Sequence, residues 1–369
     1  MNNNIFIIGN GFDLSHGLDS GYKHFIDWVY KSYFLQVANK HFESNLIEFE
    51  IDNPFLNYRI KDSDSYVKGY FEDDKVFKEI FLRLKSISGY EDFYSKHQAD
   101  LGVMQKIKSK TGQPPYKFHY QYEKNIMFNN IINEYHKNKN WVDIERLYFR
   151  LLISEPNTEK LNQDFEVLQN KFEEYLIQLN PLQFIPQYKD YFLNFRKYPD
   201  GNNLILNFNY TNTYTHYIPN DFQVINIHGQ LNDPRNKIIF GYGDYESEDY
   251  KKLESLDDNK KLKNIKLFDY CQTDNYEKLT DKLNNPFDVH ILGHSCGLSD
   301  RGLLREILNR NECVKIYVYY FQYEAEGKLA DDYTDKVQNL SRCFDNKQDF
   351  IRKIKSKEDG YKMFQVQRK

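Results

Sequence analysis

The chain has 369 residues, of which 40% are hydrophobic and 28% charged, enough for a large core divided between two substructures. Its net charge of −4 argues against nucleic-acid binding, which needs a basic surface, and no apolar run reaches the roughly 18 residues of a membrane helix. The four cysteines lack the paired spacing of a zinc site, so we expect free thiols and no metal; they are Cys271, Cys296, Cys313 and Cys343. Nothing resembles a signal peptide, so we expect a cytoplasmic protein.

The first predicted element is a buried strand over residues 5–8, followed by a glycine turn and the start of a helix. The turn reads Gly9-Asn10-Gly11-Phe12-Asp13. In α/β proteins such a turn presents backbone N–H groups to a phosphate, and the helix N-terminus adds partial positive charge. Leu14 stands where the usual dinucleotide-binding pattern has its third glycine, so the turn needs support from other segments. A helix is predicted over 22–38.

The second zone, residues 41–199, is polar and is interpreted as a large, mostly helical insertion. Apolar residues at three- and four-residue spacing predict helices over 67–87, 120–135 and 158–179. Asn157 or Thr158 is the expected cap of the last helix, and residues 111–115 are a predicted loop. Because this zone carries no catalytic motif, we expect it to regulate the protein.

The third zone returns to alternating strands and helices. This alternation predicts a mostly parallel, doubly wound, Rossmann-like sheet. Its core comprises residues 1–40 and 200–325, and residues 326–369 are a C-terminal helical segment, with helix predicted over 328–357. Strands are predicted over 204–208, 222–227, 237–240, 288–293 and 314–321, with a helix over 300–308.

Polar residues follow several of these strands at their carboxyl ends, where the ligands of such sheets bind. Each residue alone is explained equally well as a turn former or a helix cap. Their gathering at one edge instead favours a shared site made by Gly9, Asn10, Gly11 and Asp13, by Asn209, Tyr210, Thr211 and Asn212, by His228 and Gly229, and by Gly293, His294, Ser295 and Asp300.

Segments 7–18, 206–211, 227–229 and 291–295, together with Asp300, resemble in order the motifs of the AbiH family, bacterial proteins of phage abortive infection. AbiH proteins in turn resemble the sirtuin-like NAD-binding fold. The resemblance implies that Asn209 lies beside the nicotinamide ribose and that His228 is the base. It also implies a set of ligand-binding residues: Gly9, Asn10, Gly11, Phe12, Asp13, Tyr210, Thr211, Gly229, Gly293, His294, Ser295 and Asp300.

Two departures from the sirtuin pattern narrow the expected activity. Asp13 replaces a small Ser or Thr, and a carboxylate repels a pyrophosphate, so Asp13 either caps the helix or binds a ribose hydroxyl. The chain also lacks a cysteine-ligated zinc module, which disfavours deacetylation and favours cleavage of NAD as a substrate. Nicotinamide leaves as a neutral base, so the reaction needs a pocket that stabilises an oxocarbenium ion and one base, without an acid or a metal.

Two alternatives stay open. Gly293-His294-Ser295-Cys296-Gly297 matches the nucleophile elbow of serine hydrolases, but no histidine follows His294, so a triad using Ser295 would need His228 in an unusual order. The chain could also be a nucleotide-binding sensor without turnover. The expected partners are a small-molecule nucleotide, a phage-derived or host trigger, and a second copy of the chain.

Overall fold

The structure, a computed structural model, divides the chain into two compact units. Unit 1 comprises Met1–Gly21, Glu145–Asn162 and Gln169–Lys369, and unit 2 comprises Tyr22–Ile144 and Gln163–Leu168. The structure describes residues 2–26, 28–29, 32, 50–51, 58–59, 125–137, 143–179, 183–196, 202–325 and 327–366. The helix predicted over 67–87 and the loop predicted over 111–115 lie outside these residues.

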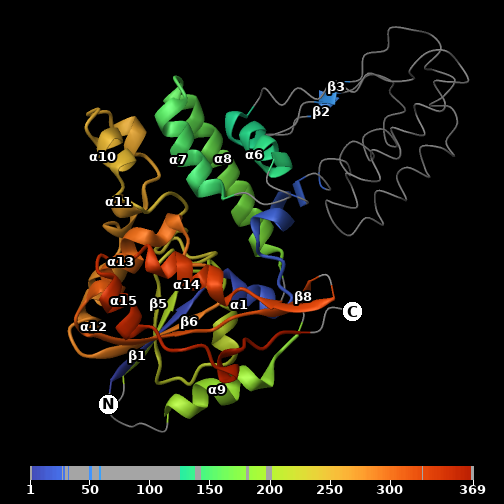
Figure 1. The fold of residues 1–369 in the computed structure, drawn as a ribbon. Coiled ribbons are helices and arrows are strands. Elements are labelled where there is room, and N and C mark those ends of the chain that lie inside the picture. Colours follow the sequence, from blue (N-terminus) through green and yellow to red (C-terminus); the bar gives the residue numbers. More distant parts are fainter. Residues whose placement is uncertain are drawn as a thin grey trace, which may run out of the picture. The chain divides into compact units, whose positions relative to one another are not determined.

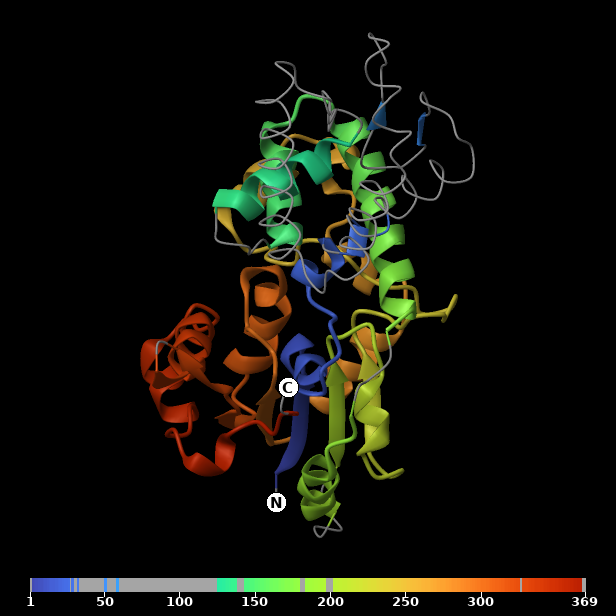
Figure 2. The ribbon, with the colours of Figure 1, turned by 90° about the vertical axis from the view of Figure 1, so that its right-hand side faces the viewer.

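Unit 1 is built on a five-stranded parallel sheet with the order β5-β4-β1-β6-β7. Figure 2 shows β1 (blue) between β4 (green) and β6 (orange). In chain order the strands run 3-2-1-4-5, the order of doubly wound proteins, whose ligands bind where the order reverses. The predicted α/β class and parallel sheet are confirmed. The strands are β1 Asn3–Ile8, β4 Asn203–Asn207, β5 Gln223–Asn226, β6 Phe287–Leu292 and β7 Cys313–Val318.

The central strand β1 is covered on both faces, as the middle strand of a parallel sheet must be. Ile5 and Ile7 point into one hydrophobic cluster, whereas Phe6 and Ile8 point into another. The last residue of β1 pairs with the last residues of β4 and β6. The carboxyl ends of these three strands are therefore level, and the residues that follow them meet at one edge of the sheet.

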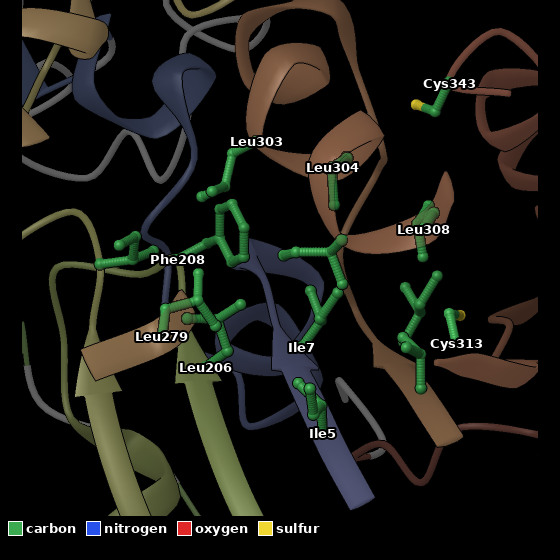
Figure 3. Close-up of a cluster of buried hydrophobic side chains, with 14 of the residues drawn as sticks. Ile5, Ile7, Leu206, Phe208, Leu279, Leu303, Leu304, Leu308, Cys313 and Cys343 are labelled. Carbon is green, nitrogen blue, oxygen red and sulfur yellow. The ribbon is translucent and has the colours of Figure 1, made fainter. Parts of the chain in front are cut away.

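One face of the sheet packs against helices α12 (Asn275–Lys282), α13 (Arg301–Asn309) and α14 (Tyr333–Ser341). The apolar residues of α13 recur at three- and four-residue spacing, so they all face the sheet. Figure 3 shows the side chains that fill this layer, with labels on Ile5, Ile7, Leu206, Phe208, Leu279, Leu303, Leu304, Leu308, Cys313 and Cys343.

The opposite face packs against α1 (Asn10–Ser15), α9 (Pro186–Arg196) and the 3₁₀ turn η2 (Thr213–His216). This layer is aromatic, and Phe6 of β1 packs edge-to-face against Phe192 of α9 at 5.4 Å between ring centroids. The two layers together make the helix–sheet–helix arrangement of unit 1 (Figure 1).

The segment between β5 and β6 adds α10 (Glu248–Glu254), the 3₁₀ turn η3 (Asn259–Leu262) and α11 (Lys266–Tyr270). Two longer helices precede β4, namely α7 (Ile144–Ser154) and α8 (Thr158–Ile177). The Asn157 side chain accepts a hydrogen bond from the Lys160 N–H at 3.1 Å, which confirms the cap predicted for α8.

In unit 2 the structure describes helix α6 (Ile126–Lys137) and a short antiparallel pair, β2 (Glu50–Ile51) and β3 (Tyr58–Arg59). Helix α6 overlaps the helix predicted over 120–135. The Asn125 side chain accepts from the Phe128 N–H at 2.8 Å and so caps it.

The strand predicted over 237–240 is wrong. These residues form a loop that folds back on the end of β5, with the Ile239 N–H donating to the His228 carbonyl at 2.8 Å. Ile238, Ile239 and Phe240 are buried, so their apolar run reflects burial of a loop rather than pairing in the sheet.

The C-terminal segment is only partly helical. Helices α14 and α15 (Lys347–Lys353) lie within the predicted 328–357 range, and the 3₁₀ turn η5 (Asp359–Tyr361) follows. Residues Lys328–Asp331 instead form β9, which pairs antiparallel with β8 (Gln322–Ala325). Gly327, at φ +72°, lies in the turn that joins the two strands.

The boundaries of a separate insertion over 41–199 stay a prediction, because most of residues 41–124 lie outside the described part of the chain. Among the described residues, no helix is long and apolar enough to span a bilayer.

Candidate functional site

Two glycine turns meet at the carboxyl edge of the sheet, one after β1 and one after β6. The Gly11 N–H donates to the Gly293 carbonyl at 2.7 Å. Gly293 has a φ of +73°, and a Cβ added to it would lie 2.1 Å from the Phe12 nitrogen. A Cβ on Gly9 would lie 2.4 Å from the His294 Cα. Only glycine permits this backbone contact, which lies where the strand order reverses.

Three backbone N–H groups of the first turn, those of Gly9, Gly11 and Phe12, have partners within the protein. Gly9 donates to the Leu292 carbonyl at 3.0 Å, and Phe12 donates to the Gly9 carbonyl at 2.8 Å. A phosphate bound through the N–H groups of Gly11 and Phe12 would have to replace these bonds. In this structure the glycines bring the two turns together.

Asp13, Asn209 and Thr211 lie beside the first turn, and we call them the Asp13 group. The Thr211 hydroxyl donates to Asp13 Oδ2 at 2.5 Å, and the Asn209 amide donates to the Gly9 carbonyl at 3.1 Å. The N-cap of α1 is Gly9, without a side-chain cap bond. The Asp13 carboxylate therefore bonds across to the β4 turn and does not cap α1.

The Asp13 carboxyl is buried, with 1% of the residue exposed. Burial raises its pKa from 3.8 to about 6, against hydrogen bonds from Thr211 and other polar neighbours that lower it. Its second oxygen, Oδ1, has no hydrogen-bond partner among the described residues. A buried acceptor without a donor is costly, so this oxygen requires an explanation.

A second polar cluster follows β5 and β6, and we call it the Asp300 cluster. Asp300 Oδ1 lies 2.7 Å from Lys266 Nζ and 3.4 Å from His228 Nε2, while Oδ2 lies 3.3 Å from His294 Nε2. Lys266 Nζ also lies 3.1 Å from Glu145 Oε1. The Asp300 side chain is 13% exposed and the other four are 7% or less, so Asp300 is the member nearest solvent.

Hydrogen bonds fix the tautomers of both histidines. His228 Nδ1 lies 3.1 Å from the Phe208 carbonyl, which can only accept, so Nδ1 carries the proton and Nε2 keeps its lone pair. The Tyr270 hydroxyl, 3.1 Å from Nε2, is then the donor to it. His294 Nδ1 accepts from the Cys296 N–H at 2.9 Å, so its Nε2–H points to the central carboxylate.

The charges of the Asp300 cluster follow from burial and pairing. Burial and the Lys266 ammonium lower the pKa of His228 to about 3, so this ring is neutral at pH 7. Burial alone would raise the pKa of Asp300, but Lys266 and the two histidines hold it well below its usual range. Burial alone would lower the pKa of Lys266, but Asp300 and Glu145 raise it above its ordinary value. With Glu145 as a carboxylate, the cluster carries one net negative charge.

Phe208 connects the Asp13 group with the Asp300 cluster. Its ring packs edge-on against His228 at 5.0 Å and against His294 at 4.5 Å between centroids. Asn209 directly follows it in the chain. The structure thus brings most of the predicted site residues to one edge of the sheet.

Sequence reasoning missed Lys266, Glu145 and Tyr270, because none of them follows a strand. Glu145 had a readable signal: in α7 it shares the buried stripe of Tyr148, Phe149 and Leu152 at spacings of three, four and seven. A carboxylate on the apolar face of a helix indicates a buried cation. That cation is Lys266, which lies in an apolar segment at the start of α11.

Four predicted ligand-binding residues are not members of these two clusters, although the Tyr210 ring lies 6.4 Å from the His228 ring between centroids. Phe12 is fully buried in the aromatic layer, and the Tyr210 hydroxyl donates to the Ile239 carbonyl at 3.1 Å. Asn10 is exposed, and Gly229 continues the turn after His228.

Ser295 does not have the setting of a nucleophile elbow. The residue with positive φ is Cys296, at +54°, rather than the serine, and the serine is exposed. No histidine among the described residues hydrogen-bonds the Ser295 hydroxyl, because His228 and His294 are directed to Asp300. Both observations disfavour the serine-hydrolase alternative.

No group of three His, Cys, Asp or Glu side chains within the described ranges is arranged to hold a metal ion. The histidines of the Asp300 cluster are hydrogen-bonded to protein atoms at both ring nitrogens. The cluster is therefore a hydrogen-bonded ionic network in this structure.

The strand order and the polar carboxyl edge define an α/β protein with a doubly wound parallel sheet and a buried ionic cluster at the carboxyl edge of that sheet. The family model described as "Bacteriophage abortive infection AbiH" matches residues 5–322. The chain belongs to this AbiH family. No curated protein and no solved structure matches the chain.

Proposed function

We propose that this AbiH protein is an NAD glycohydrolase that acts in abortive infection. It cleaves the bond between nicotinamide and ribose, with Asn209 positioning the ribose and His228 as the base. NAD is a substrate here rather than a cofactor. The proposal draws on the resemblance of AbiH proteins to the sirtuin-like NAD-binding fold. The proposed reaction takes place in the cytoplasm, where an infecting phage replicates.

The observation that carries the proposal is the pairing of His228 with Asp300. The neutral ring presents an unprotonated Nε2, because Nδ1 is held by the Phe208 carbonyl. The Asp300 carboxylate lies 3.4 Å from that nitrogen and would stabilise the imidazolium once a proton arrives. This pair lies at the edge of the sheet where doubly wound proteins bind nucleotides.

The reaction suits the charge of the site. When the C1′–N bond breaks, its electron pair neutralises the pyridinium nitrogen, and nicotinamide leaves behind an oxocarbenium ion on the ribose. A net negative cluster stabilises such a cation. Water then adds to C1′ and gives its proton to His228, which leaves ADP-ribose. A weak base suffices because the C–N bond breaks before the water loses its proton.

The resting state supports a controlled enzyme. His228 is 3% exposed, and the Tyr270 hydroxyl occupies its Nε2. Burial raises the pKa of Tyr270 well above its ordinary value, so this hydroxyl keeps its proton and continues to donate. Substrate must displace that contact. A protein that depletes NAD has to be inactive before infection, so the proposal includes a phage-derived or host trigger and allows for a second copy of the chain.

The test is loss of NAD and release of nicotinamide by the purified protein, with and without lysate of infected cells as a source of trigger. We expect release by the wild type, and a loss of about a hundredfold or more in His228→Ala and Asn209→Ala. His216→Ala, which changes an exposed histidine of the same unit, is the matched control and should keep full activity.

The same samples separate the alternatives. Binding of NAD without nicotinamide release in either condition would replace the enzyme by a nucleotide-binding sensor. This alternative is favoured by the buried state of His228. The absence of both NAD binding and nicotinamide release would refute the proposal. Nicotinamide release that survives in His228→Ala would also refute it.

A further inference from the structure

We propose that Asp13 binds a hydroxyl group of the ligand's ribose through its unpartnered oxygen Oδ1. The sugar it recognises therefore carries a free hydroxyl, and a phosphate or a fluorine in that place is rejected. The inference rests on the proposed function only for the identity of the ligand that carries the ribose.

The free oxygen is held in a fixed direction. Oδ2 accepts from the Thr211 hydroxyl at 2.5 Å, which orients the carboxylate, while Oδ1 has no partner in the described part of the chain. Thr213, Asn209 and Ser20 are close enough to lower the pKa of Asp13, but none of the three meets hydrogen-bond geometry at Oδ1. The Asn209 amide, however, donates to the Gly9 carbonyl, and the Ser20 hydroxyl donates to the Asn10 side chain.

The surroundings of Asp13 select the kind of ligand group. In the ranges that the structure describes, no Lys, Arg or His forms an ion pair with this carboxylate, and its polar neighbours are hydroxyls and an amide. A phosphate would meet an uncompensated negative charge, which is repulsive. A neutral O–H donor instead gains a charge-assisted hydrogen bond. A sugar hydroxyl is the donor that also fits hydroxyl and amide neighbours.

Ser20, one of the polar neighbours of Asp13, also contacts an exposed side chain. The Ser20 hydroxyl donates to the side chain of exposed Asn10 at 2.5 Å, and Gly17, at φ +75°, lies in the turn before it. One hydrogen bond to an exposed side chain contributes little net free energy to folding. A ligand hydroxyl that displaces Ser20 would reach Oδ1 and leave Asn10 as a second partner for the sugar.

The experiment combines a ligand change with a protein change. The probes are nicotinamide mononucleotide, which contains one ribose, and its 2′-deoxy-2′-fluoro and 3′-deoxy-3′-fluoro analogues, which keep the shape but lose one donor. Binding is measured by calorimetry with the full chain. For the wild type we expect one analogue to bind about 10- to 100-fold more weakly than the parent.

The variants Asp13→Asn and Asp13→Ala test whether this discrimination comes from Asp13. The fluorine penalty should fall to a few-fold in Asp13→Asn, whose amide accepts a weaker bond, and disappear in Asp13→Ala. Asp288→Asn changes another carboxyl whose pKa is raised by burial, at the opposite end of the sheet, and should keep the full penalty. A merely structural role would lower the affinity for all three probes equally.

The outcomes also separate this inference from NAD hydrolysis, which is measured in parallel. Discrimination that depends on Asp13, without NAD cleavage, supports the hydroxyl site and refutes the hydrolase. NAD cleavage by a wild type that binds both analogues as tightly as the parent refutes the hydroxyl site, and so does a penalty that persists in Asp13→Ala. No binding of any probe refutes the hydroxyl site, and no binding together with no NAD cleavage refutes both.

Discussion

Lys266 compensates two carboxylates at once, with Asp300 at 2.7 Å and Glu145 at 3.1 Å from its ammonium nitrogen. All three groups are removed from bulk water, so each depends on the others for its charge. A buried pair of this kind adds little net stability, but breaking it leaves an uncompensated charge in the interior. The cluster is therefore sensitive to the loss of one member and tolerant of the replacement of all three.

We expect Lys266→Met to lower the free energy of unfolding by about 3–5 kcal/mol, because two carboxylates lose their counter-ion. The triple variant Lys266→Met, Glu145→Gln, Asp300→Asn should recover most of this loss. Urea denaturation followed by circular dichroism measures both. Lys263→Met, at an exposed position of the same segment, is the control, and a single variant no less stable than that control would contradict the assigned network.

Asp13 should make the stability of unit 1 depend on pH. Its pKa is about 6 in the folded protein against 3.8 for the free side chain, so the folded state binds more protons between these values. The destabilisation of the folded state by the ionised Asp13 carboxylate is absent below about pH 4, grows as the pH rises, and is complete above about pH 6. At 1.36 kcal/mol per unit it amounts to about 3 kcal/mol.

Asp13→Asn removes this charge, so we expect the variant to be more stable than the wild type at pH 7 and equal to it near pH 4. Thermal unfolding at a series of pH values gives the difference. A variant that is less stable at every pH would mean that the carboxylate stabilises the fold, which would also weaken the argument that its free oxygen is kept for a ligand.

Residue-level reasoning found Asp13, Asn209, His228 and Asp300 because each follows a predicted strand, and parallel strands bring such positions to one edge. It could not find Lys266 or Tyr270, since nothing in the sequence relates α11 to the ends of β5 and β6. It also predicted free N–H groups in the first glycine turn, whereas Gly11 donates to Gly293. That contact depends on how closely two distant turns approach, which local sequence does not encode.

At the scale of elements, two glycines with almost the same dihedral angle differ in their surroundings. Gly293 joins β6 to the site at φ +73° and is in contact with the first turn, whereas Gly327 joins β8 to β9 at φ +72° and has no atom within 4 Å of an added Cβ. The strain of a side chain at positive φ is common to both. Only Gly293 adds a clash with backbone.

Gly327→Ala should therefore lower the free energy of unfolding by about 1 kcal/mol, the cost of the left-handed conformation alone. Gly293→Ala should cost several kcal/mol more, because the Cβ would lie 2.1 Å from the Phe12 nitrogen and the two turns would have to separate. Chemical denaturation of both variants gives the comparison. Equal losses would show that the turns can part freely.

For the whole molecule, the sequence predicted the sheet better than the segments between its strands. Continuous apolar runs such as 5–8 and 204–206 identify strands buried on both faces. The same logic failed at 237–240, where Ile238, Ile239 and Phe240 are buried in a loop. It failed again at Lys328–Asp331, an exposed strand without an apolar face. A local apolar pattern reports burial, and it reports pairing only when the partner strands are also known.

The position of β1 in the sheet has a consequence for how the protein is made. Asn2, directly before β1, hydrogen-bonds Asp288, 286 positions later, and both neighbours of β1 are translated long after it. At roughly 5–20 residues per second, the ribosome needs on the order of 15 to 60 seconds to supply β6. During that time an apolar strand has no sheet to join. We therefore expect the nascent chain to depend on chaperones until its second half emerges, and folding of the finished chain to be slow because its central contacts are so non-local.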